Sequence, residues 1–204
     1  MIHRMLVGVA IAGAAIAASP LMAEPELAAT VPNFRALDMH GKVVDLAAYR
    51  GKTVVLEWNN PGCPFVKKHY GTGNMQKTQA AATAQGVVWL TINSGAPGQQ
   101  GHMTGPEARK FVAAEKARPT AYLLDPRGLV GKGYGAKTTP HLYIIDGRGR
   151  LVYKGGIDDR PTADVADIAG ARNHVLAALA EMRAGKPVSV PETRPYGCSV
   201  KYAS

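Results

Sequence analysis

Cysteine is scarce in this sequence, with only Cys63 and Cys198 among 204 residues. Two thiols are too few for the disulfide framework that holds together many small secreted domains. No second cysteine or histidine lies at metal-ligand spacing from Cys63, so the sequence predicts neither a metal site nor a cofactor. In an oxidising compartment, two such thiols are expected either to pair with each other or to be kept for chemistry.

Acidic residues are few, 15 against 24 basic ones, which gives a formal net charge of +9. The lysines and arginines are scattered along the chain, and aromatic residues make up only 6% of it. A nucleic-acid surface of the stacking type needs a basic stripe with aromatic side chains between the charges, and the sequence has no such stripe. We therefore expect a solvated basic surface and no nucleic-acid partner.

Long apolar runs are missing except near the N-terminus. Residues 1–4 include one arginine, residues 5–18 are apolar and uncharged, and the small residue Ala23 precedes the acidic Glu24. The apolar run is shorter than the roughly 20 residues that a membrane-spanning helix needs. We therefore expect residues 1–23 to be a secretory signal peptide, and the mature protein to be periplasmic or secreted without stable membrane insertion.

The remaining chain alternates short apolar strands with helices and contains no internal repeat. The expected strands cover residues 33–37, 43–46, 53–58, 87–93, 121–124, 142–145 and 151–153. The expected helices cover residues 64–70, 74–85 and 104–117, followed by a long helix from Thr162 to Gly185. This order predicts an α/β domain over residues 24–185, with an N-terminal hairpin and a central mixed sheet flanked by helices.

The last segment, residues 186–204, has a different composition. It contains Pro187, Pro191 and Pro195, and it carries Cys198. Proline lacks a backbone N–H and fixes its own φ, which disfavours both helix and central strand. We therefore expect an extended C-terminal tail that straps across the domain.

Cys63 lies where an apolar strand and a short loop give way to a predicted helix, and Pro64 suits the first helical position. Unpaired backbone N–H groups and the helix dipole favour negative charge there. We therefore expect a lowered pKa for the Cys63 thiol and a more populated thiolate. Lys67 and Lys68, one turn along, can add to this effect, although at least one of them is expected to be a solvated surface residue.

Glu57 and Pro140 are candidate supporting residues, because each is unusual for its place in the sequence. Glu57 interrupts an apolar strand, and a buried carboxylate there would have a raised pKa and could accept a proton from a reacting thiol. Pairing of Glu57 with one of the two lysines is equally open. Pro140 stands at the entry to a core strand, which indicates either a cis Thr139-Pro140 bond beside the thiol or an ordinary trans proline.

The histidines give a weaker signal. His69 lies about two turns into the predicted helix, where it can face the thiol, and His141 follows Pro140. A histidine beside Cys63 can tune its pKa or act as a base. We expect surface or structural roles for His40 and His174, and we place only His141 near the thiol.

Two stretches of the chain resemble the redoxin group of thioredoxin-fold proteins, which includes the alkyl hydroperoxide reductase/thiol-specific antioxidant (AhpC/TSA) family and the periplasmic thioredoxin-like reductases. They cover residues 33–56, and residues 139–146 with Gly147, Gly149 and Gly155. The resemblance extends over roughly residues 30–185 and implies a thioredoxin-like fold.

The resemblance also implies roles for individual residues. Cys63 matches the attacking cysteine, and Pro140 matches the cis-proline that, with Thr139, docks the backbone of the substrate. Glu57 matches the acidic or amide position beneath the active site. Val66 stands where thioredoxins have their second cysteine, so a local dithiol–disulfide cycle is impossible.

The match to peroxiredoxins is incomplete. Pro64 follows the reactive cysteine as it does in peroxiredoxins, but Asn60 replaces their threonine or serine. The arginine that orients peroxide in peroxiredoxins aligns with Pro140, so this sequence lacks it. A thiol peroxidase is therefore the weaker alternative, in which Asn60 would still supply a hydrogen bond to peroxide.

Cys198 leaves three possible functions open. As a resolving thiol for oxidised Cys63, it would make the protein an exported thiol-dependent oxidoreductase, or a peroxidase, that reacts with a redox partner protein, a small thiol or peroxide. As a permanent disulfide partner of Cys63, it would make the protein a redox-inactive binding module. The oxidoreductase is the leading hypothesis.

Overall fold

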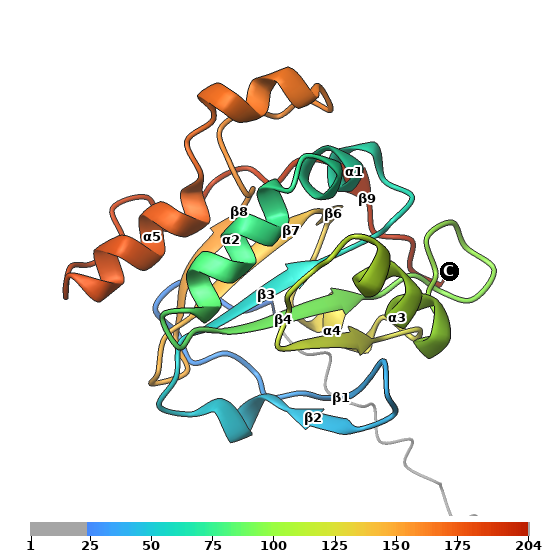
Figure 1. The fold of residues 1–204 in the computed structure, drawn as a ribbon. Coiled ribbons are helices and arrows are strands. Elements are labelled where there is room, and N and C mark those ends of the chain that lie inside the picture. The colour runs from blue at the N-terminus through green and yellow to red at the C-terminus, as the bar shows by residue number, and fades with distance from the viewer. Residues whose placement is uncertain (1–23, 204) are drawn as a thin grey trace, which may run out of the picture.

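A seven-stranded sheet forms the centre of the structure, a computed structural model that describes residues 24–203 (Figure 1). The strands lie in the order β2-β1-β5-β4-β3-β7-β8. Their bounds are β1 (Arg35–Asp38), β2 (Val43–Asp45), β3 (Val54–Trp58), β4 (Val88–Asn93), β5 (Ala121–Leu124), β7 (His141–Ile145) and β8 (Leu151–Gly155). The β3–β4 and β4–β5 pairs are parallel and the other neighbouring pairs antiparallel, which confirms the mixed sheet and the N-terminal hairpin of β1 with β2.

Helices cover both faces of this sheet. They are the 3-10 helices η1 (Leu46–Tyr49) and η2 (Val165–Gly170), and the α-helices α1 (Pro64–Gly71), α2 (Asn74–Thr83), α3 (Gly105–Ala114), α4 (Leu129–Gly133) and α5 (His174–Arg183). Side chains of α1, α2 and α5 pack in one hydrophobic cluster with Val55, whereas α4 packs with Leu56 in another. Because successive strand residues face opposite sides, Glu57 lies on the same face as Val55, beneath α1 and α2.

The long last helix expected from Thr162 is wrong. The chain forms η2 and a separate α5 in its place. Asp164 caps η2 and Asn173 caps α5, each by accepting a backbone N–H at 2.9 Å. Val165, expected on the buried stripe, is 57% exposed. The expected helix is therefore divided in two, and Gly170 ends the first part. The capping side chains satisfy backbone N–H groups at two separate helix starts, which favours two short helices over one continuous helix.

The short helix α4 was not predicted from the sequence, because its five residues include two glycines and have a low helix propensity. It is stabilised from outside its own sequence. The Asp125 carboxylate accepts the backbone N–H groups of Leu129 and Gly131, both at 2.9 Å, and the Ser94 hydroxyl at 2.7 Å. A carboxylate just ahead of the helix in the chain therefore supplies what the helix propensity of α4 lacks.

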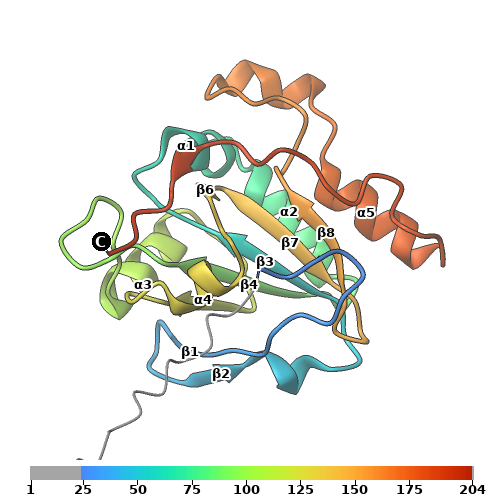
Figure 2. The same cartoon turned by 180° about the vertical axis from the view of Figure 1, so that it is seen from behind.

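The C-terminal tail is extended, as expected. Figure 2 shows it in red, running from α5 past α1 to the C-terminus. It forms the short strand β9 (Cys198–Ser199), which pairs antiparallel with β6 (Thr138–Thr139) in a separate two-stranded sheet. The predicted signal peptide lies outside the described residues. Within residues 24–203, no helix has the length and apolar character needed to cross a membrane.

Candidate active site

Cys63 lies at the N-terminus of α1, where the sequence placed it. It is the N-cap residue, with extended backbone angles, and α1 begins at Pro64. The Val66 backbone N–H in the first turn lies near the Cys63 sulfur and favours its thiolate form. The helix start therefore provides a fixed donor for a thiolate. The side chain itself is fully buried, with 0% of its surface exposed.

Cys198 reaches Cys63 through the pairing of β9 with β6. In this register Cys198 lies opposite Thr139, next to Pro140. The two thiols lie close enough for each to shift the pKa of the other, and both are free in this structure. Cys63 is buried, whereas Cys198 is only partly buried. Two cysteines far apart in the sequence thus meet in one site.

The two thiols differ in acidity. Burial alone would raise the pKa of Cys63, but hydrogen bonds from the Cys198 thiol, the Val66 backbone and Thr139 lower it below the ordinary value. Burial, and then the hydrogen bond and charge of Cys63, raise the pKa of Cys198 to about 11. Cys63 is therefore the thiol that ionises first, while Cys198 holds its proton.

Thr139 and Pro140 border the pair. The Thr139-Pro140 peptide bond is cis, the first of the two alternatives that the sequence left open. The Cys63 thiol donates to the Thr139 carbonyl at 3.0 Å, and the Thr139 hydroxyl donates to the Cys198 carbonyl at 3.5 Å. The tail thus occupies the backbone edge that the sequence assigned to substrate docking.

Asn60 and Pro64 are near Cys63 in the chain but play different parts. The Asn60 amide donates to the Gln100 side chain at 3.0 Å, and its oxygen accepts the Gly62 N–H at 2.9 Å. The Asn60 side chain therefore orders the loop before Cys63. Pro64 is exposed at the first position of α1. Contact of either residue with a substrate stays a prediction.

Glu57 is fully buried and surrounded by hydrogen-bond donors. Its carboxylate accepts Trp89 Nε1 at 2.8 Å, the Tyr70 hydroxyl at 2.8 Å, the Thr91 hydroxyl at 3.0 Å and Gln79 Nε2 at 3.2 Å. Burial raises the pKa of Glu57, and these hydrogen bonds partly offset the rise. The residue ties α1 and α2 to β3 and β4, and its proton-transfer role stays a prediction.

Neither Lys67 nor Lys68 stabilises Cys63 or Glu57 in the way that the sequence suggested. Lys68 is buried, and its ammonium donates to the carbonyls of Arg160 and Thr162 at 3.0 and 3.1 Å. Lys67 is exposed. Among the described residues, the ion pairs and hydrogen bonds of Glu57 include no lysine, so the lysine pairing left open for Glu57 is wrong.

A buried group next to Cys198 was missed. Tyr196 in the tail donates its hydroxyl to Asp158 and lies 3.2 Å from His69 Nε2. The Tyr196 ring also packs edge-on against Phe65 of α1, with centroids 5.9 Å apart. We call Tyr196, Asp158 and His69 the tail clasp. It holds the tail two residues before Cys198, and only the unusual density of tyrosine and cysteine in the tail hinted at it.

The roles of His69 and His141 therefore differ from those expected from the sequence. Burial lowers the pKa of His69 to about 4, with Lys68 acting in the same direction and Asp158 against it. His141 is also buried, and its Nδ1 lies 3.3 Å from both the Tyr143 hydroxyl and the Lys137 N–H. His141 thus orders the strand entry, while His69 serves the tail clasp.

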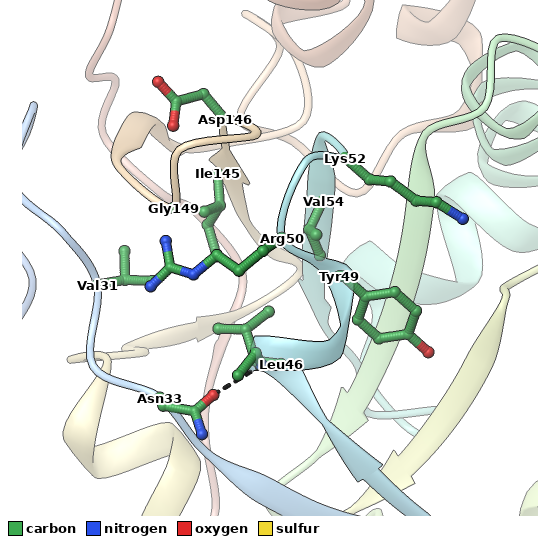
Figure 3. A pocket seen from close by; sticks show the side chains of 11 residues that line it. Val31, Asn33, Leu46, Tyr49, Arg50, Lys52, Val54, Ile145, Asp146 and Gly149 are labelled. Atoms are coloured by element: carbon green, nitrogen blue, oxygen red, sulfur yellow. Dashed lines mark hydrogen bonds between the residues drawn. The ribbon is translucent and has the colours of Figure 1, made fainter.

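Two hollows in the protein differ in size and in distance from the cysteines. One, of about 620 Å³, lies beside the tail and is lined by Thr138, His174, Arg194 and Gly197 among others. The other, of about 10 Å³, has room for roughly one water. Figure 3 shows it between Leu46, Arg50 and Val54, at the end of β3 away from Cys63. Of these two hollows, the larger one reaches Gly197, the chain neighbour of Cys198, although neither cysteine lines it.

The comparisons with known proteins agree with this geometry. The AhpC/TSA family model matches residues 27–154. A hypothetical protein from Sinorhizobium meliloti is 26% identical, with 89% of this chain and 97% of that chain covered and a TM-score of 0.73. An uncharacterized conserved protein from Geobacillus kaustophilus is 28% identical, with 87% and 93% covered and the same TM-score.

A more distant structure shares the fold alone. It is a secreted Mycobacterium tuberculosis disulfide oxidoreductase homologous to E. coli DsbE, with 22% identity, 67% of this chain and 92% of that chain covered and a TM-score of 0.51. No curated protein matches this sequence. The family match includes Cys63 and Pro140 and ends before the tail. Because it spans more than half of the chain, this protein belongs to the AhpC/TSA family, within the redoxin group of thioredoxin-fold proteins.

Proposed function

We propose that this protein is an exported thiol-dependent oxidoreductase whose redox-active pair is Cys63 and Cys198. The observation that supports it most is that the pairing of β9 with β6 brings Cys198 beside Cys63, where one thiol is acidified and the other is not. A lowered pKa gives Cys63 the thiolate that attacks sulfur, and a nearby thiol allows a disulfide to close within the molecule. Cys198 would thus replace the second cysteine of thioredoxins, whose place Val66 takes.

The proposed reaction is reversible exchange with a dithiol or disulfide of a partner protein or a small thiol. In one direction the two thiols of this protein give up two electrons and two protons and close a disulfide, while the partner disulfide opens to two thiols. Thr139 and Pro140 would shape the site around the sulfurs. Glu57 would act mainly by holding α1 against the sheet, which fixes the direction of the helix start at Cys63.

Peroxide is the less favoured oxidant in this proposal. The Asn60 amide, which would hydrogen-bond a peroxide, is already engaged by Gln100. We infer further that residues 1–23 direct export, that residues 24–185 form the redoxin domain, and that residues 186–204 serve as the cysteine-carrying tail. Sequencing the N-terminus of the exported protein tests the first point, with Glu24 as the expected first residue.

A redox titration tests the proposal. The mature protein is equilibrated across ratios of reduced to oxidised glutathione, free thiols are alkylated, and their number is counted by mass. We expect a two-thiol transition at a potential roughly between −120 and −270 mV, where exchanging dithiols operate. A bond that stays closed until the protein unfolds would instead identify a stapled binding module. The Cys198→Ser variant is the control and should lose the two-thiol transition.

A further inference from the structure

We propose that the outer edge of β2 is an interaction surface on which a second copy of this chain docks, so that two sheets join edge to edge about a two-fold axis. The inference is independent of the proposed thiol exchange, because it uses neither cysteine. β2 is the last strand at its end of the seven-stranded sheet. Figure 1 shows it along the lower border of that sheet.

The two edges of the sheet differ in how their backbone groups are paired. At β8, the Lys154 N–H donates to the Pro191 carbonyl at 3.0 Å, and the Thr193 N–H donates to the Lys154 carbonyl at 3.1 Å. The tail therefore covers that edge. At β2, no other segment of residues 24–203 forms a backbone hydrogen bond along the outer side. A strand edge with unpaired backbone groups is a template for pairing with another chain.

The pairing of β1 with β2 shows which backbone groups of β2 point outward. The Lys42 carbonyl accepts the Asp38 N–H at 2.8 Å, so residue 42 faces β1. The Leu46 N–H donates to the Phe34 carbonyl at 3.1 Å, so residue 46 faces β1 as well. Hydrogen-bonding direction alternates along an antiparallel strand. The N–H and carbonyl of Val43 therefore point away from the sheet, where another strand can pair with them.

The side chains beside these groups form an apolar patch. Leu37 lies opposite Val43 in the register of β1 and β2, so the two side chains share one face of the hairpin. They are 51% and 48% exposed. A hollow of about 300 Å³ lies beside them, lined also by Arg35 and Ala36. The same edge thus offers unpaired backbone groups together with apolar side chains that are left in water.

Charge favours this edge as the place where two copies meet. The whole chain carries a formal charge of +9, so two copies repel each other on average. Residues 35–45 contain two basic and two acidic residues, which are Arg35, Lys42, Asp38 and Asp45. The hairpin of β1 and β2 therefore has no formal net charge, and a second hairpin can approach it without that repulsion.

The side chains also select the register of the pairing. An antiparallel pair about a two-fold axis can oppose Val43 to Val43, Val43 to Asp45, or Asp45 to Asp45 of the second copy. The last arrangement opposes like charges, and the second places an apolar side chain against a carboxylate. Pairing Val43 with Val43 joins the two apolar patches in one row and places Asp45 opposite Gly41. We therefore assign the Val43 pair to the axis.

The dimer leaves the cysteine site free. β3, which leads to Cys63, is four places from β2 in the sheet order, and strands lie about 4.8 Å apart. The interface is small, because β2 has only three residues. We therefore expect a reversible dimer with a dissociation constant on the order of 10 μM, and an unchanged redox titration of Cys63 and Cys198.

Sedimentation velocity of the reduced mature protein, from about 1 μM to about 1 mM, tests the inference. We expect monomer at the low end and dimer at the high end. Val43→Lys opposes two like charges across the axis and should weaken association at least tenfold, by roughly 1.4 kcal/mol. Val165→Lys is the matched control, because Val165 is equally exposed, at 57%, and lies outside the sheet. It adds the same charge and should leave the dimer unchanged.

A charge swap tests the register itself. Val43→Lys and Val43→Glu should each sediment as monomers, and an equimolar mixture should recover the dimer, because Lys and Glu then face each other. Urea denaturation checks that both variants are folded. A native protein that stays monomeric up to about 1 mM would overturn the inference. A dimer that both variants retain would overturn it too, because that dimer would use another surface. A mixture that stays monomeric would refute the pairing of Val43 with Val43.

Discussion

Cys63 and Cys198 sit in two differently built parts of the molecule. Cys63 belongs to the scaffold: it caps the start of α1, after the short loop that follows β3, and its surroundings are fixed by the hydrophobic cluster and by Glu57 beneath. Cys198 belongs to a strap without helix, held by a two-residue strand and the tail clasp. The scaffold places one sulfur at a helix start, and the strap brings the second sulfur beside it and helps to lower the pKa of the first.

The largest expected effect lies in the scaffold, at Glu57. Glu57→Leu removes the acceptor of five buried donors, so we expect the free energy of unfolding to fall by about 3 kcal/mol or more. Urea denaturation measures it. Glu57→Gln keeps the shape and one acceptor oxygen and should lose less. Equal stability of all three proteins would show that this buried network does not support the scaffold.

Acid should weaken the contact between scaffold and strap at His69. The folded pKa of His69 is about 4, below its ordinary 6.5, so the unfolded chain binds a proton first as the pH falls. Stability is therefore lost between pH 6.5 and 4, by about 3 kcal/mol for this group, and falls no further for this group below pH 4. His69→Asn should flatten the pH dependence of the unfolding free energy in this window. The same slope with and without the histidine would contradict this assignment.

Within the strap, Gly197 is the sharpest test. Its φ is +131°, and a Cβ there would lie 2.1 Å from the Thr139 carbonyl oxygen, so Gly197→Ala should push β9 away from β6. We expect a loss of about 1–3 kcal/mol and faster alkylation of Cys63 in the reduced protein. Gly185→Ala is the matched control, because Gly185 has φ +69° and open space around its Cβ. Equal alkylation rates in both variants would break the proposed link between the strap and Cys63.

The smallest effect concerns acidity alone. Cys198→Ala removes the neighbouring thiol that lowers the pKa of Cys63, so we expect the pKa of Cys63 to rise. Cys198→Ser keeps a donor at that position and should leave the pKa closer to that of the native protein. The ultraviolet absorbance of the thiolate against pH measures both. A Cys63 pKa that is unchanged in the alanine variant would show that the scaffold alone sets it.

The sequence predicts a structural feature when the residues that determine it are close together in the chain. The strand before Cys63, the loop and the helix that begins at Pro64 lie within a few residues of one another, so their pattern predicts the placement of the thiol at a helix start. The hairpin and the strands follow from alternation in the same way. The long helix from Thr162 failed because its apolar spacing continues across the caps at Asp164 and Asn173, and spacing alone does not reveal a cap that is used.

The sequence by itself thus determined the sheet, the helix start under Cys63 and the extended character of the tail, because these depend on neighbouring residues. The tertiary structure alone decided that Glu57 meets neutral donors and no lysine, and that His69 holds Tyr196. It also decided that Cys198 lies beside Cys63. Each of these contacts joins residues far apart in the chain. Their partners are selected by the packing of the whole sheet and its helices, which no local pattern encodes.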